Sequence, residues 1–238
     1  MKDLPAIDLE GISDPFAKFE ASLPFNRTLV TLMLQKLDEA EKECGEEGFV
    51  TLAALRRQLS TSAWQPLTDP NSTLSKTLLS AAFKDAKKKQ TAEQIDVNWL
   101  KVWALLHCSG KPIDKTRAFF CILQEGGFEK HDQISAGDKD FIPVFDKVCA
   151  FATADVFGFA HEAGMLATPL YSADEAKQLL DVCEILREDH WLEQVYGANS
   201  RLQSDDWVQK VSTTANWIFN PSHMRHRLFE LAQVAKRH

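Results

Sequence analysis

Few residues in this chain have the types and spacing that metal or nucleophile chemistry requires. His223 and His226 are three apart, so a helix would bring them together as candidate metal ligands. A solvated basic helix end explains the pair more simply. Cys108 follows His107 directly, and adjacent helical residues point apart, so these two make no thiolate pair.

Two further patterns also lack the partners that catalysis needs. Asp189 and His190 are adjacent, but no serine or cysteine stands at a recognisable nucleophile elbow, and we interpret His190 as a surface residue. Gly126 and Gly127 precede no P-loop lysine and follow no strand pattern, so they form no phosphate loop. We therefore predict no catalytic residue, no cofactor and no enzymatic activity.

Composition restricts the classes of partner and the cellular compartments that we predict. The 238 residues carry a net charge of −7, which argues against a nucleic-acid binder, and the lysines between positions 84 and 89 are typical of a solvated loop. The five cysteines are scattered without a CxxC pair, a reduced, intracellular pattern that predicts the cytoplasm or the cytoskeleton. We see no signal peptide and expect no membrane span.

The elements that position these residues follow a repeated plan. A helical stripe, a polar loop, one apolar residue, a capping residue and a second helix recur four times at roughly forty-residue spacing. Strand patterning is nearly absent, so the predicted fold is all-α, with one-rung bridges at most. We expect the acidic stretch 38–47 to interrupt the first helix, and residues 152–171 to form an irregular insert. The apolar residue and its capper are Val50-Thr51, Ile95-Asp96, Ile134-Ser135 and Leu202 with Ser204.

This repeat resembles the EF-hand superfamily, the calmodulin and calcineurin B group. In that family the eighth loop residue is apolar and pairs with its twin in a second loop, the ninth caps the exiting helix, and the thirteenth is apolar. Val50, Thr51 and Leu55 match these places in the first loop. Ile95, Asp96 and Leu100 match them in the second, Leu202 and Trp207 match two of them in the fourth, and Ile134 and Ser135 match two in the third.

The metal-binding places depart from the family pattern. A calcium loop needs alternating carboxylates and a bidentate acid at the twelfth place. Ala54 and Trp99 occupy that place in the first two loops, and the second loop also carries lysines that repel a cation. We therefore predict no metal site, with a calcium sensor that uses an irregular third or fourth loop as the alternative. Their candidate ligands are Glu129, His131, Asp132 and Asp138 in the third loop, and Asn199 and Asp206 in the fourth.

Aromatic residues gather on the helices that flank the second and third loops. Most of them belong in the core, but paired EF-hands also use such residues to line a groove for an amphipathic helix. A helix predicted from Pro221 could instead fill this groove within the chain. The candidate partner-binding groove consists of Trp99, Trp103, Phe119, Phe120, Phe141 and Phe145.

These inferences predict two lobes of paired, degenerate EF-hand-like units. The expected divisions are an N-terminal arm over 1–28, an N lobe over 29–110, a C lobe over 111–214 and a C-terminal helix over 215–238. The predicted function is calcium-independent protein binding, as an adaptor, a light-chain-like protein or a structural subunit of a larger complex. A small helical enzyme of unrelated fold is the remaining alternative.

Overall fold

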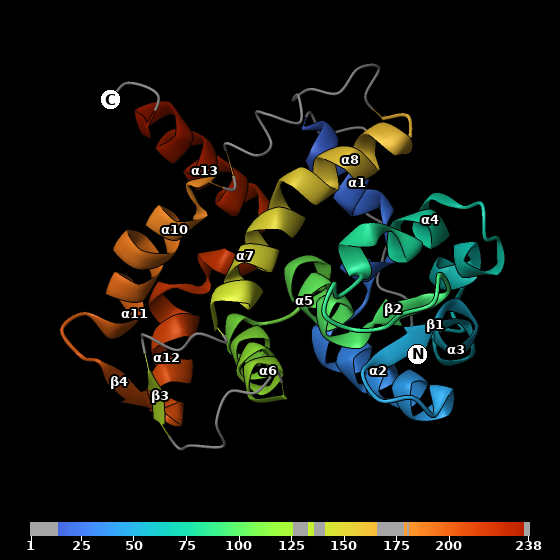
Figure 1. The fold of residues 1–238 in the computed structure, drawn as a ribbon, viewed down its shortest axis with the longest axis horizontal. Helices are drawn as coiled ribbons and strands as arrows, with labels where there is room; N and C mark the ends of the chain where they lie inside the picture. Colours follow the sequence, from blue (N-terminus) through green and yellow to red (C-terminus); the bar gives the residue numbers. More distant parts are fainter. Residues whose placement is uncertain (1–13, 126–132, 136–140, 166–178, 180, 236–238) are drawn as a thin grey trace. The chain divides into compact units, whose positions relative to one another are not determined.

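Helices contain most of the residues in the computed structural model of this chain (Figure 1), which confirms the all-α class. The structure describes residues 14–125, 133–135, 141–165, 179 and 181–235. Among the helices of these ranges, none has the length and apolar character that crossing a bilayer requires.

The chain divides into two units, which are described separately. Unit 1 comprises the residues up to Gly110 together with a segment that begins at Gly158, and unit 2 comprises Lys111–Phe157 and the chain from Pro169 onward. The elements before Gly110 are α1 (Pro15–Ser22), η1 (Pro24–Arg27), α2 (Val30–Cys44), β1 (Phe49–Thr51), α3 (Leu52–Gln58), η2 (Ser62–Thr68), α4 (Thr73–Leu79), η3 (Ala81–Phe83), β2 (Gln94–Asp96) and α5 (Val97–His107).

The remaining elements begin at Pro112. Helix α8 starts in unit 2 and ends in unit 1, and η4 is a π-helical turn between α10 and α11. These elements are α6 (Pro112–Glu125), β3 (Gln133–Ser135), α7 (Phe141–Ala152), α8 (Ala154–Glu162), α10 (Cys183–Ile185), η4 (Leu186–Leu192), α11 (Glu193–Tyr196), β4 (Arg201–Gln203), α12 (Ser204–Thr214), η5 (Asn216–Phe219) and α13 (Pro221–Ala235).

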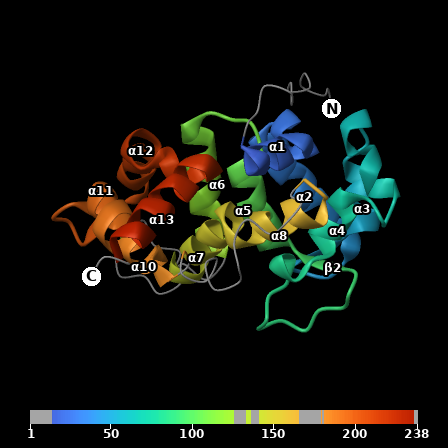
Figure 2. The same cartoon turned by 90° about the horizontal axis from the view of Figure 1, so that it is seen from above.

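Among the residues that the structure describes, each unit contains one two-stranded antiparallel sheet. Val50 pairs with Ile95 in unit 1, and the backbone of Ile134 pairs with that of Leu202 in unit 2. These are the apolar residues whose pairing the repeat predicts. In both units the helix that precedes the first strand packs against the helix that follows the second, α2 on α5 and α6 on α12 (Figure 2).

The helix starts follow from local sequence. The Asp14 side chain accepts a hydrogen bond from the Phe16 amide at 2.9 Å, and Pro15 fits the first turn, where no donor is needed. The side chain of Thr51 caps α3 and that of Asp96 caps α5, as predicted. Ser204 is not a cap, however. It is the first residue of α12, behind Gln203.

Two sequence predictions about helix extent are wrong. The acidic stretch 38–47 does not interrupt the first helix, because α2 continues to Cys44, where Gly45 ends it in the left-handed conformation. Asp38 in this stretch pairs with the buried Lys101 of α5 at 2.9 Å, so acidity there serves helix packing. Residues 154–162 of the expected irregular insert form α8.

Buried aromatic rings form the core of each unit. In unit 1, Trp103 packs edge-on against Phe25, Phe83 and Phe159, the last of which comes from the C-terminal half of α8. Phe16, Phe19 and Phe25 of the predicted N-terminal arm are also buried. In unit 2 the corresponding cluster contains Phe119, Phe141, Phe145, Trp191 and Trp207.

Candidate functional site

The paired loops of unit 1, residues 43–54 and 84–99, contain the features that most resemble a binding site. Sheet β1–β2 joins them (Figure 1), and each is followed by a helix that a side chain caps. The Thr51 hydroxyl accepts from the Ala54 amide at 3.3 Å, and the Asp96 carboxylate accepts from the Trp99 amide at 3.0 Å. The two loops therefore enter and leave the sheet in the same way.

The first loop turns at Gly48, whose φ is +83°. In the EF-hand alignment that the sequence suggests, Gly48 falls at the sixth place, where such loops have glycine. Sequence reasoning did not single out this glycine. The carboxylate of Glu43, at the first place, instead pairs with Arg57 and accepts from Gln58 at 3.1 Å. These two contacts, Gln58 first, lower the pKa of Glu43.

Lysine ammonium groups take up the polar interior of the second loop. The Nζ atom of Lys84 donates to the carbonyl oxygens of Thr91 at 3.2 Å, Ala92 at 3.0 Å and Gln94. Burial lowers the pKa of this ammonium. Lys88 pairs with the buried Asp96 at 2.6 Å. Of the four lysines expected to form a solvated, cation-repelling run, Lys84 and Lys88 therefore bind the loop itself, whereas Lys87 and Lys89 are exposed.

Lys88 also joins the two loops. Its Nζ atom lies 5.5 Å from the ring centroid of Phe49 in β1, and a Cβ added to Gly48 would meet it at 3.4 Å. The Val97 amide donates to the Gly48 carbonyl at 3.1 Å. Contacts of one loop with the other thus supplement the three-residue sheet.

Within the described ranges, no group of three histidine, cysteine or acidic side chains lies close enough to hold a metal ion. The third-loop candidates Glu129, His131, Asp132 and Asp138 fall outside these ranges, as does the Gly126-Gly127 pair. In the fourth loop, Asn199 and Asp206 are exposed. His107 is buried, and its ring is tilted against that of Trp103, with ring centroids 3.9 Å apart.

The six residues of the predicted groove belong to different units. Trp99 and Trp103 lie in unit 1, and the four phenylalanines lie in unit 2. Four of the six are buried in the cores, so the core interpretation that the sequence left open applies to them: Trp103, Phe119, Phe141 and Phe145. Trp99 and Phe120 are half-buried. Phe120 lines a depression of about 530 Å³ between α6 and α12.

Helix α13 packs against α7 and η4 within unit 2. Met224 and Leu228 are fully buried on its inner face. The buried Arg225 donates to the Ala152 carbonyl at 3.0 Å and so ties α13 to the end of α7. The predicted C-terminal helix is therefore an integral part of unit 2.

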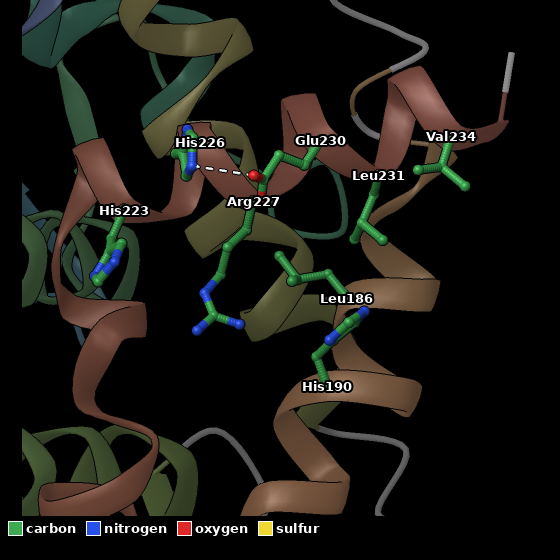
Figure 3. A pocket seen from close by; sticks show the side chains of 8 residues that line it. All are labelled: Leu186, His190, His223, His226, Arg227, Glu230, Leu231 and Val234. Atoms are coloured by element: carbon green, nitrogen blue, oxygen red, sulfur yellow. Dashed lines mark ion pairs between the residues drawn. The ribbon is translucent and has the colours of Figure 1, made fainter.

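A cleft of about 330 Å³ lies between α13 and η4 (Figure 3). Leu186, Leu231 and Val234 supply its apolar surface, and Val234 is 52% exposed. Its polar lining brings together three histidines that the sequence analysis treated separately, with one guanidinium and one carboxylate: His190, His223, His226, Arg227 and Glu230. His226 pairs with Glu230 at 3.2 Å, and Arg227 stacks on Trp217 at 4.1 Å.

Comparisons with known proteins do not assign this chain to a family. No protein-family model matches the chain, and neither a curated protein nor a solved structure is significantly similar to it. Function must therefore be argued from the loops, the cores and the clefts themselves.

Proposed function

We propose that this chain is a calcium-independent protein-binding module built from paired EF-hand-like units. It serves as an adaptor, a light-chain-like protein or a structural subunit of a larger assembly. The observation that carries the proposal is the second loop, where lysine ammonium groups hold carbonyl and carboxylate oxygens that a cation would otherwise bind. A calcium switch needs an ion whose occupancy opens a helix pair. A loop filled by its own lysines has no such ion to gain or lose.

The packing of the cores supports a constitutive module. Phe159 of α8 covers Trp103 in unit 1, and α13 lies against α7 in unit 2. On this proposal, these segments cover the helix faces that a calcium signal would expose in a calcium-sensing EF-hand pair. A partner must then bind elsewhere on the surface.

The cleft between α13 and η4 is the surface that fits a partner best. Its apolar strip, Leu186, Leu231 and Val234, suits the apolar face of an amphipathic helix. Its polar lining consists of Arg227, Glu230 and three histidines. The occupant is an amphipathic helix of another protein, with polar residues beside its apolar face that pair with Arg227 and Glu230.

The test is affinity capture from the native source with three forms of the full chain. Wild type is compared with Val234→Asp, which places a charge in the cleft, and with Ile142→Asp, a matched control. Ile142 is 37% exposed on α7 in unit 2 and does not line the cleft. Each capture is run with calcium and with chelator.

We expect the same partners with calcium and with chelator, retained by Ile142→Asp and lost by Val234→Asp. Capture that requires calcium would contradict the proposed independence. Equal capture by all three forms would contradict the cleft, and no specific capture by wild type would contradict the adaptor function itself.

A further inference from the structure

The Lys84 side chain makes a complete set of hydrogen bonds inside the second loop. A lysine ammonium has three N–H donors and no acceptor. Three backbone carbonyls accept from it, those of Thr91, Ala92 and Gln94. The number of acceptors equals the number of donors, which distinguishes this contact from the single ion pairs of surface lysines.

The carbonyls that surround this ammonium would repel one another without a positive charge. The three carbonyls come from a stretch of four residues. Because all of them accept from the same Nζ atom, their dipoles converge on one point. The loop also closes on itself nearby: the Gln94 amide donates to the Thr91 carbonyl at 3.4 Å, and the Thr91 amide donates to the Gln94 side chain at 2.7 Å. Such a ring of backbone oxygens is a site for a cation.

We infer that loop 84–94 is a cation-binding loop whose bound cation is the ammonium of Lys84. The inference rests on the proposed function and deepens it. Gln94 precedes Ile95 and so stands at the seventh place of an EF-hand-like loop, where the backbone carbonyl binds the metal. A covalently attached primary ammonium takes the place of that ion. The order of β2, and its pairing with β1, therefore depends on the charge of one side chain.

Replacement of Lys84 by methionine tests this dependence, with Lys87→Met as the matched control. Methionine keeps most of the side-chain length but removes the donors, and Lys87 is an exposed lysine of the same loop. We expect Lys84→Met to lower the melting midpoint of the full chain by about 4 °C. We also expect faster hydrogen exchange at the amides of 94–96. Lys87→Met should change neither, and equal behaviour of the two variants would overturn the inference.

Chemical rescue tests whether the loop recognises a cation rather than side-chain bulk. Lys84→Ala leaves the carbonyls without their donor, and added methylammonium can supply one. We expect methylammonium to raise the midpoint of Lys84→Ala relative to wild type. Tetramethylammonium, which has the charge but no N–H donor, should not. Rescue by neither ion, or by both equally, would contradict the assignment.

A measurement on the wild-type chain avoids any folding defect of the variants. Nitrogen-15 spectra of the lysine ammonium groups should contain one slowly exchanging Nζ signal that disappears in Lys84→Arg and remains in Lys87→Met. Absence of this signal would overturn the inference. These readouts use the isolated chain, so they stand or fall separately from partner capture.

Discussion

The two loops of unit 1 reach the same register by different means. The first loop obtains its sharp turn from Gly48, whose φ of +83° suits glycine, and its Glu43 carboxylate is bound by Arg57 and Gln58. The second loop is longer and is organised around the Lys84 ammonium. Yet Val50 and Ile95 still face each other in the sheet. The comparison shows that two loops with unrelated interior contacts can support the same pairing of Val50 with Ile95.

The largest predicted loss of stability comes from a substitution in the second loop. Asp96 is 1% exposed, caps α5 and pairs with Lys88, so Asp96→Ala removes a cap and leaves an ammonium without its carboxylate. We expect a loss of about 3 kcal/mol in the free energy of unfolding. Denaturant unfolding of the full chain measures it. Asp96→Asn keeps an acceptor for the cap and should lose less, whereas a loss below about 1 kcal/mol for Asp96→Ala would refute the double role.

The next largest loss of stability is expected from a substitution at the turn of the first loop. Gly48→Ala forces a side chain into the left-handed region, close to Lys88, and should cost about 1–2 kcal/mol. Gly158→Ala is the matched control, because this glycine lies inside α8 with no atom within 4 Å of an added Cβ. That substitution should stabilise by about 0.5–1 kcal/mol. Thermal melting should show midpoint changes of opposite sign, and a Gly48→Ala midpoint equal to or above that of wild type would show that the turn does not need glycine.

A smaller effect sharpens the comparison between the two caps. Thr51 caps α3 with one hydrogen bond and makes no ion pair, so Thr51→Ala should cost about 1 kcal/mol, near a third of the Asp96 effect. Thr51→Ser preserves the hydroxyl and serves as the control. If Thr51→Ala were as costly as Asp96→Ala, the ion pair with Lys88 would contribute nothing.

The smallest expected effect is that of calcium. A ligand that binds only the native state must raise the melting midpoint. With Ala54 at the twelfth place of one loop and lysines in the other, we expect millimolar calcium to shift the midpoint by less than about 1 °C relative to chelator. A rise of several degrees in the melting midpoint would contradict calcium independence and favour the calcium-sensor alternative.

The sequence predicted the features that depend on neighbouring residues. The caps Thr51 and Asp96 and the helix start at Pro221 are as expected. It failed at α2 and α8. Acidic and alanine-rich turns are good helix formers, so charge alone did not mark the end of α2. Gly158 lowered the helical signal of α8, but Phe159 and the segment around it gain enough from packing to keep the helix.

What the sequence determined by itself was the repeated order of helix, loop, apolar residue and cap, because each part of that order depends on residues within one or two turns. Only the tertiary structure decided what fills the loops and the cores. Lys84 and Gln94 are ten positions apart, and nothing in their types distinguishes a solvated lysine from one enclosed by carbonyls. Likewise, the burial of Trp103 depends on Phe159, more than fifty residues away, because close packing joins segments whose distance along the chain carries no local signal.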